Sequence, residues 1–546
     1  MILSSLLALT LTQAWQRGQP VPMADATVAA LPCVSYAPFH RIGSTPLEPH
    51  GAVSAEQIEE DLARLKPLTN CIRTYGVAQG LDAVPAVARK LGMRVRQGAW
   101  LGRDETANRI EIDRAVTLAQ DYRDVIDVLV VGNEVLLRRD LSAEQLASHL
   151  RYAKSRINIV ITYADVWEFW QKNASLQTDV DWVTVHILPY WEDRPVAAKD
   201  AADHVFKIAH AMEKVFIGKP IWVGETGWPA AGRQRAGARP GVVEQTLLIR
   251  QLASRAATEA VPINFIEGFD QPWKRALEGA MGGAWGLFAA DGTRRVQLSG
   301  DVIEGSDGWL LWVGAGAGFL LMAITLLLGA LIANRARDYS NISARWRFIQ
   351  RLSMATRQHT LPLPNFLTLS IGAALLGAAV VLHGAFIVLW SRTPRESFNA
   401  SAIAAIVVAA TIVMLWAVSG VLPTSIKRAR SVARCLAWAR VALLFVAASW
   451  ALVLIADPRY RGFPVALFAV PAALSVGMML MPGSHQFFRR ESLFLATALL
   501  LAAAVMVAQE GVANGEALAL AGCWLLLAAP AILRSMMRSG ERNARQ

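Results

Sequence analysis

Metal-binding cysteine motifs are missing from this sequence. Its 546 residues include only four cysteines, with no CxxC pair and no cluster of cysteine and histidine. A zinc or iron–sulfur site is therefore not expected. Cys33 and Cys71 fall on neighbouring expected strands. We expect small buried core residues at these two positions, and a disulfide between them is the alternative.

A basic patch on a soluble region is also missing, which argues against nucleic-acid binding. Residues 1–300 hold 33 basic and 33 acidic residues, so residues 301–546 carry the whole net charge of +11. There the basic residues lie between long apolar runs, as in the loops of a membrane protein. No nucleotide-sugar glycosyltransferase domain is visible, and no glycine-rich phosphate loop follows the first expected strand.

Seven apolar segments in the second half are each near the ~20 residues that a membrane-spanning helix needs. They are 309–333, 366–390, 401–422, 437–456, 463–481, 492–509 and 517–534. Basic residues fill the first, third and fifth loops and the tail 535–546. The positive-inside rule places these loops in the cytoplasm and the first half of the chain on the opposite side. We therefore expect a transmembrane domain over 309–534 in a bacterial inner membrane, with a periplasmic domain before it.

The chain before residue 300 divides into a short leader and an alternating β/α region. Residues 1–22 begin with an apolar stretch that lacks a basic start, and we expect a signal peptide or an N-terminal anchor there. Within 32–298, Ser54 with Gln57 and Ser142 with Gln145 form capping-box patterns that predict helix starts. Eight β-rich runs are expected to form strands, at 33–39, 71–76, 93–100, 126–134, 157–164, 182–190, 221–228 and 263–270.

Eight β/α units in about 270 residues are typical of a TIM barrel, and a doubly wound sheet is the second choice. The expected fold class is α/β: a (β/α)8 TIM barrel followed by an all-α multi-pass transmembrane domain. In such a barrel, the C-terminal ends of the strands carry the chemistry.

Two of the expected strands end in glutamate, Glu134 after VLVVGN and Glu225 after IWVG. Two carboxylates that face each other across a cleft suit glycoside cleavage, and in a retaining enzyme they are about 5–5.5 Å apart. The charge of one is expected to raise the pKa of the other and so keep the acid protonated near neutral pH. From the spacing alone, two unrelated rim glutamates in ion pairs are the alternative.

The stretches around both glutamates resemble glycoside hydrolase family 17. The resemblance covers roughly residues 32–295 and rests on Gly132-Asn133-Glu134, Gly224-Glu225-Thr226-Gly227-Trp228-Pro229, Ile72–Tyr75, Leu188–Trp191, Phe269-Asp270 with Lys274, and Trp285–Phe288. It implies a barrel that acts on β-1,3-glucan, with Glu134 as acid/base and Glu225 as nucleophile. The whole architecture is similar to rhizobial proteins of periplasmic cyclic β-(1→3),(1→6)-glucan synthesis, which implies transfer that forms β-1,6 linkages.

The same resemblance implies roles for further residues. Asn133 would hydrogen-bond the 2-hydroxyl of the sugar, and Trp228 would brace the nucleophile loop. The other candidate substrate-binding residues are Tyr75, Tyr190, Trp191, Trp273, Lys274 and Asp270. For each aromatic residue, core packing is the alternative. His186 stands where many relatives carry an apolar residue, and the stretch 270–274 departs from the family's Asp-Glu-Asn-Gln-Lys, which puts linkage specificity in doubt.

A retaining enzyme of this kind passes through a covalent glucosyl intermediate, which a sugar hydroxyl resolves in a transferase and water resolves in a hydrolase. Membrane tethering favours a transferase that remodels glucan as it leaves an inner-membrane synthase. The alternatives are an endo-β-1,3-glucanase and, in another class, a non-catalytic glucan-binding or export component. The expected partners are β-glucan, the lipid bilayer and such a synthase; no cofactor, metal or nucleic acid is expected.

Overall fold

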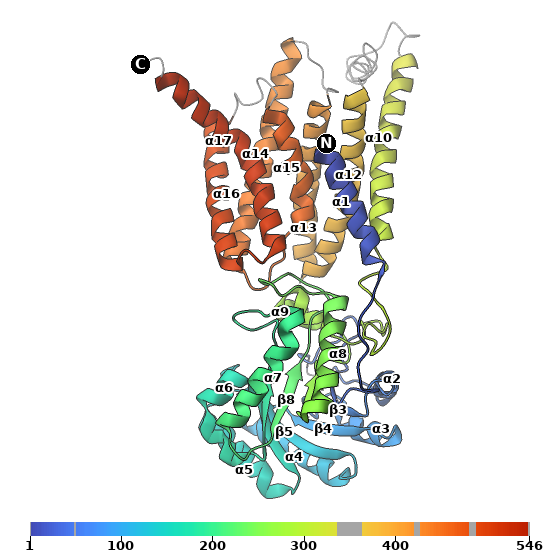
Figure 1. Ribbon diagram of the computed structural model, residues 1–546, viewed down its shortest axis with the longest axis vertical. Helices are drawn as coiled ribbons and strands as arrows, with labels where there is room; N and C mark the ends of the chain where they lie inside the picture. Colours follow the sequence, from blue (N-terminus) through green and yellow to red (C-terminus); the bar gives the residue numbers. More distant parts are fainter. Residues whose placement is uncertain are drawn as a thin grey trace. The chain divides into compact units, whose positions relative to one another are not determined.

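The computed structural model describes residues 2–48, 51–335, 363–391, 393–419, 426–479 and 488–543. The chain divides into two compact units (Figure 1). One is a barrel unit over Pro20–Glu304. The other is a helical unit formed by Met1–Gln19 and Gly305–Gln546.

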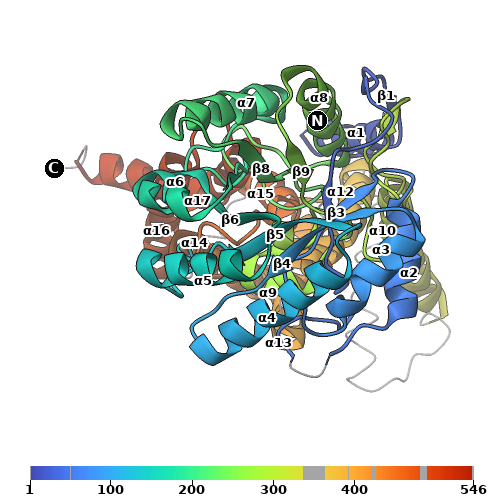
Figure 2. The same ribbon diagram turned by 90° about the horizontal axis from the view of Figure 1, so that it is seen from below.

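Eight parallel strands close into a barrel, and their order around the barrel is their order in the sequence (Figure 2). They are β2 (Val34–Ser35), β3 (Cys71–Arg73), β4 (Arg94–Ala99), β5 (Ile126–Asn133), β6 (Val160–Val166), β7 (Trp182–His186), β8 (Ile221–Thr226) and β9 (Ile263–Phe265). The TIM-barrel prediction is confirmed. The doubly wound alternative is excluded, because β2 pairs with both β3 and β9.

Helices follow the strands and surround the barrel (Figure 2). They are α2 (Ala55–Leu65), α3 (Val84–Lys90), α4 (Glu105–Asp121), α5 (Ala143–Arg156), α6 (Trp167–Lys172), α7 (Ala198–Val215), α8 (Val242–Glu259) and the short α9 (Arg275–Glu278). Ser142 and Gln145 form the predicted reciprocal capping box at α5. Ser54 caps α2 as predicted, but the Gln57 side chain donates to Pro38 O instead of closing the box.

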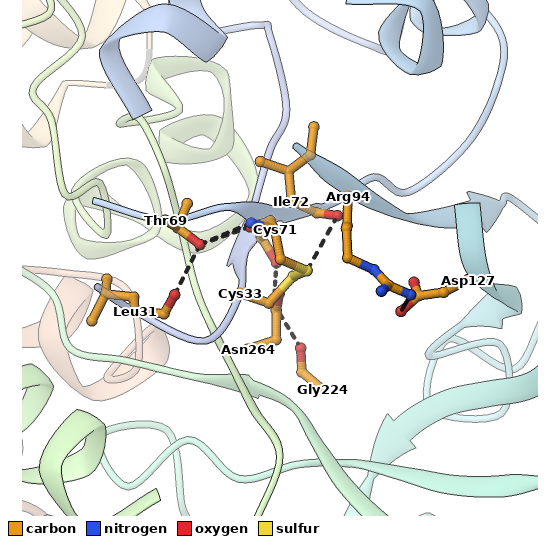
Figure 3. Close-up of a disulfide and its surroundings, with 10 residues drawn as sticks. Leu31, Cys33, Thr69, Cys71, Ile72, Arg94, Asp127, Gly224 and Asn264 are labelled. Atoms are coloured by element: carbon orange, nitrogen blue, oxygen red, sulfur yellow. Dashed lines mark hydrogen bonds and ion pairs between the residues drawn. A yellow bond between two sulfur atoms is a disulfide. The ribbon is translucent and has the colours of Figure 1, made fainter. Parts of the chain in front are cut away.

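Cys33 and Cys71 form a disulfide beside the first two barrel strands (Figure 3). Their Cα atoms are 4.5 Å apart, which is within the range that a disulfide can bridge. The preferred expectation of free core cysteines is therefore wrong, because the pairing of β2 with β3 brings the two side chains into contact. Disulfides persist mainly in oxidising compartments such as the periplasm, so this bridge bears on the location of the barrel unit.

Among the described residues, six helices of the helical unit are long and apolar enough to cross a membrane. They belong to α10 (Trp309–Arg335), α12 (Leu363–Trp390), α13 (Pro394–Val418), α14 (Ile426–Ala456), α16 (Arg489–Glu510) and α17 (Gly515–Asn543). The seventh expected segment, 463–481, forms the shorter helix α15 (Val465–Met479), which contains Pro471. A helix of that length measures ~22 Å, which is less than the ~30 Å of a hydrocarbon core.

Only some of the basic residues that predict how the helices are oriented in a membrane lie among the described residues. The first basic loop, within residues 336–362, lies outside the described residues, as does 480–487 of the fifth loop. Arg489 and Arg490 begin α16. The orientation of the helices in a membrane therefore stays a prediction.

The N-terminal segment forms a helix, α1 (Ile2–Arg17), that belongs to the helical unit. Its Leu7 and Leu11 pack against small residues of α10 and α12. Strand β1 (Pro20–Val21) follows and pairs antiparallel with β10 (Val302–Ile303). The chain therefore enters and leaves the barrel unit through two adjacent strands.

Candidate active site

Glu134 follows β5 directly, in a turn that its neighbours make possible. Gly132 has a φ of 85° and Glu134 a φ of 52°, both in the left-handed region that glycine adopts freely and other residues rarely. A Cβ on Gly132 would come within 2.9 Å of Val135. A glutamate held in this region is typical of functional sites, since the surrounding structure must stabilise the strained backbone.

The turn is fixed from both neighbouring strands. The Glu134 amide donates to Ala164 O of β6 at 2.8 Å. The Arg138 guanidinium donates to the carbonyl oxygens of Asn133, the last residue of β5, and of Leu101, which follows β4. The Glu134 side chain keeps 25% exposure. It therefore reaches the mouth of the barrel from a rigid support.

Glu225 lies deeper, within β8, and its side chain is only 6% exposed. Its neighbour Gly224 has no room for a side chain, because a Cβ there would meet Thr184 Cγ2 at 2.3 Å. Arg73 Nη1 donates to Glu225 Oε1 at 3.0 Å and to Gly224 O at 2.9 Å. A buried carboxylate needs a paired cation of this kind to stay ionised.

The two carboxylates meet at His186, the last residue of β7. His186 Nδ1 lies 2.9 Å from Glu134 Oε1, and His186 Nε2 lies 3.6 Å from Glu225 Oε1. One polar atom from each of these three side chains lies within 4.8 Å of the other two. This spacing is near the roughly 5–5.5 Å of retaining glycosidases and well below the roughly 6.5–9.5 Å of inverting ones.

Histidine and two carboxylates are also residue types that bind metals. Here Arg73 Nη1 lies 3.0 Å from Glu225 Oε1 and 3.5 Å from His186 Nε2. The cluster thus contains a fixed positive charge, which would repel a second cation. The arrangement suits acid–base and nucleophilic chemistry better than metal binding.

The pKa of Glu134 differs from the expectation. Burial acts to raise this pKa, but the hydrogen bond and charge of His186, with the charges of Arg138 and Arg73, hold it below its ordinary value. The expectation that Glu225 keeps Glu134 protonated is therefore wrong for the free protein. The sequence does not show that Arg73 and His186 lie between the two carboxylates.

Asn133 is oriented by the same arginine. Its Oδ1 accepts a hydrogen bond from Arg73 Nη2 at 2.5 Å. This contact fixes which way the amide points and leaves its NH2 as the group that can donate to a ligand. The predicted contact of Asn133 with a sugar 2-hydroxyl stays a prediction, and the amide has the orientation that it requires.

Known proteins include several that are similar to the barrel region of this chain. Residues 33–286 match the family model described as the BtgE/BtgC glycoside hydrolase domain. The barrel resembles glycoside hydrolases. Among curated relatives, the probable beta-glucosidase btgE of Aspergillus fumigatus is 26% identical over 224 residues, which are 40% of this chain and 39% of that protein.

Two further relatives and one solved structure are also similar to this chain. The probable glucan endo-1,3-beta-glucosidase btgC of Aspergillus fumigatus is 27% identical over 250 residues, covering 40% of this chain and 36% of that protein. The glucan 1,3-beta-glucosidase of Arthroderma benhamiae is 25% identical over 250 residues, covering 43% and 81%. A glycoside hydrolase family 17 beta-1,3-glucanosyltransferase from Rhizomucor miehei is 23% identical, with a TM-score of 0.43, covering 49% of this chain and 97% of that chain. This chain spans well under half the length of the two Aspergillus proteins.

Two of the predicted aromatic residues of this glycoside hydrolase-like barrel are fully buried, Tyr190 and Trp228. The Tyr190 hydroxyl donates to Arg233 O, and Trp228 Nε1 donates to Arg239 O. The Tyr190 ring packs edge-on against Trp191 and Trp228, with centroids 5.3 and 5.7 Å apart. Tyr190 therefore supports Trp191, which is half-buried and has the Arg235 guanidinium 5.3 Å from its ring centre. The role of Trp191 in substrate binding stays a prediction.

Tyr75 and Trp273 also keep partial exposure. Tyr75 lies beside the catalytic cluster, with the Arg73 guanidinium 4.9 Å from its ring centre. Trp273 Nε1 donates to Gln271 Oε1 at 2.9 Å, which fixes the orientation of the indole. Their roles as stacking platforms stay predictions.

The two charged candidates after β9 are both held in ion pairs. Asp270 is buried and accepts from Arg295 Nη1 at 2.6 Å. Lys274 Nζ lies 3.0 Å from both carboxylate oxygens of the buried Glu267. Burial raises the pKa of Glu267 to about 7, against the opposing effect of Lys274. Glu267 and Lys274 are both close enough to Glu225 for its charge to act on their pKa values. Direct substrate contacts by Asp270 and Lys274 stay predictions.

Sequence reasoning missed two contributors to the site. Arg73 counted only as part of a landmark stretch, although a single arginine in the run CIRTYG was a signal for a charged group inside the barrel. Trp100 directly follows β4 and is 46% exposed, with the Arg138 guanidinium 4.2 Å from its ring centre. An exposed aromatic residue at a barrel strand end is a pattern that could have identified it.

Proposed function

We propose that this protein is a membrane-bound, retaining β-glucanosyltransferase that acts on β-1,3-glucan and forms β-1,6 linkages in periplasmic glucan biosynthesis, with a cyclic product as in the rhizobial proteins that it resembles. The observation that carries the proposal is the approach of Glu134 and Glu225 to within 4.8 Å at the mouth of the barrel. The β-1,3-glucan substrate is supported by the names of the relatives btgC and the Arthroderma glucosidase.

In the first step, a Glu225 carboxylate oxygen attacks the anomeric carbon, and Glu134 gives a proton to the leaving oxygen. Arg73 donates a hydrogen bond to Glu225 Oε1, so the other carboxylate oxygen is the attacking atom in this proposal. The NH2 of Asn133 donates to the sugar 2-hydroxyl, a contact that strengthens as positive charge develops on the ring. The result is a covalent glucosyl ester on Glu225.

In the second step, Glu134 acts as a base and removes a proton from the incoming hydroxyl, which attacks the ester. A sugar acceptor competes with water only if the site holds the sugar in place. Trp191, whose ring makes an edge-on contact with Tyr190, holds the acceptor sugar in this proposal. This ring and the membrane anchor favour transfer.

Three features support the proposed location. The six apolar helices are long enough to span a bilayer. The Cys33–Cys71 disulfide fits an oxidising compartment. The basic loops predict a cytoplasmic side opposite the barrel unit. Helix α1, packed on α10 and α12, serves in this proposal as an N-terminal anchor, and an inner-membrane glucan synthase is a proposed partner.

Hydrolysis is the second candidate, and the names of the curated relatives, all glucosidases, favour it. The test is to incubate the purified full-length protein with a β-1,3-linked gluco-oligosaccharide and to determine product size and linkage. We expect products longer than the substrate, with new β-1,6 branches. Shorter products alone would establish a hydrolase. Binding with no turnover at any pH would leave a non-catalytic glucan-binding protein.

A further inference from the structure

One buried histidine connects the two reacting carboxylates. His186 is fully buried, and its two ring nitrogens face Glu134 and Glu225 at 2.9 and 3.6 Å. The two-carboxylate mechanism has no step that needs an imidazole. The contacts of this buried imidazole with both reacting groups are therefore not explained by the two-carboxylate mechanism.

The charged groups that face His186 come from all the strands around it. Arg73 of β3 lies 3.5 Å from Nε2, Glu134 follows β5, and Glu225 lies on β8. On β6, Asp165 is close enough for Glu134 and His186 to influence its pKa, which burial raises to about 6. Arg138 acts on Glu134 from the mouth of the barrel.

Charge balance determines how many protons this cluster holds. Arg73 and Glu225 form an ion pair and cancel. If Glu134 and His186 share one proton, their sum is also zero, whether the proton lies on the imidazole or on the carboxyl. If that proton is lost, these four groups carry one net negative charge next to the buried Asp165, which is costly in a region of low dielectric constant. The structure therefore favours one proton shared by Glu134 and His186.

We propose that His186 is a positioning residue that stores the acid proton of Glu134; the inference rests on the proposed function. In the free protein the proton lies on His186 Nδ1. When glucan excludes water, the ion pair becomes less favourable than the neutral pair. The Nδ1–H bond then breaks and an O–H bond forms at Glu134 Oε1, which leaves a neutral imidazole and a neutral acid.

Glu134 then delivers this proton. Rotation about the terminal carboxyl bond, which is soft in glutamate, turns the O–H toward the leaving oxygen. In the second step, Glu134 takes a proton from the acceptor hydroxyl and returns it to His186 Nδ1, so no proton is gained or lost in the cycle. The lowered pKa of Glu134 in the free protein supports this order, since the carboxyl is ionised while His186 holds the proton.

The consequence is a difference in pH dependence. A proton shared by two groups is lost at higher pH than a proton that either group holds alone. The basic limb of kcat/KM reports the loss of the essential acid in the free enzyme. Replacement of the imidazole by a group that cannot titrate should therefore move this limb to lower pH.

The test measures kcat/KM against pH for the full-length protein and for His186→Asn, with a β-1,3-linked gluco-oligosaccharide. We expect the basic limb of the variant to move down by about one pH unit or more, so that activity falls at least about tenfold more at pH 8 than at pH 5. A dinitrophenyl β-glucoside has a leaving group that needs no proton. Its kcat/KM should show no such shift.

The matched control is His40→Asn. His40 is another buried imidazole of the barrel unit, with Nε2 3.0 Å from Asp61 Oδ1, and it does not contact the catalytic cluster. Its variant should keep the position of the basic limb. An unmoved limb in His186→Asn, or an equal shift with the dinitrophenyl glucoside, would overturn the inference and leave the proposed function standing. If the wild-type protein turns over neither substrate, the proposed function fails and the inference fails with it.

Discussion

Replacement of Glu225 by alanine is expected to lower kcat on β-1,3-glucan by at least about 10⁴-fold, as for other enzymes that lose their nucleophile. The variant should still fold. Arg73 keeps Gly224 O and the Asn133 side chain as hydrogen-bond acceptors after the carboxylate is removed. The loss of activity would therefore report on chemistry, and a thermal unfolding scan alongside the kinetic assay checks that the fold is intact.

Rescue of the variant by azide is a second test of this prediction. A small anion can enter the space left by the carboxylate and attack the sugar from the same face, so Glu225→Ala with azide should give an α-linked glucosyl azide. The matched control is Glu144→Ala, an exposed glutamate on α5, which should keep wild-type activity. Glucan turnover by Glu225→Ala at more than about a hundredth of the wild-type rate is not compatible with a nucleophilic role.

Arg73→Met is expected to cause the largest loss of stability of any substitution at the site. It leaves Glu225 buried without its cation, which costs about 3–5 kcal/mol in comparable buried pairs. Activity should fall as well, because Arg73 orients the side chains of both Glu225 and Asn133 through hydrogen bonds. The measurement is the thermal or denaturant midpoint of the full-length protein, followed by tryptophan fluorescence.

A double-mutant cycle separates the electrostatic effect from the loss of packing. In a Glu225→Gln background, Arg73→Met should cost clearly less free energy, since no buried charge is then left unpaired. Arg89→Met is the surface control. Its salt bridge with Asp124 is solvent-exposed, so its loss should change the midpoint much less than the loss of the buried pair. Equal costs of Arg73→Met in both backgrounds would show that Arg73 acts by packing alone.

Much of the fold could be predicted because its signals are local. Most barrel strands are short β-rich runs between turn residues, and the Ser142 box marks the start of α5 within four residues. The segment 463–481 contains the helix α15 (Val465–Met479) and ends outside the described residues, so a seventh membrane span stays a prediction. The error concerns pairing. The Cys33–Cys71 disulfide depends on the pairing of β2 with β3, which no local pattern shows.

The site residues also differ in whether the sequence alone could predict them. Glu134 and Glu225 could be identified because each directly ends an apolar run in a distinctive motif. The Arg73–His186 bridge could not, because these residues are 113 positions apart and meet only when the barrel closes. Their presence reverses the expected pKa shift of Glu134, since that expectation considered the two carboxylates alone. Burial of Tyr190 and Trp228 likewise depends on how the loops pack over the strand ends.

The most direct test of the whole account is to trap the covalent intermediate. A 2-fluoro-glucoside with a good leaving group slows both steps, but it slows hydrolysis of the ester more than its formation, so the glucosyl–enzyme should accumulate. Digestion of the labelled full-length protein and mass spectrometry then locate the modified residue. We predict a single 2-fluoroglucosyl group on the peptide that contains Glu225, and no labelling of Glu225→Gln. A label on any other residue, or steady turnover with no label at all, would contradict the assignment of Glu225 as the nucleophile of a retaining enzyme.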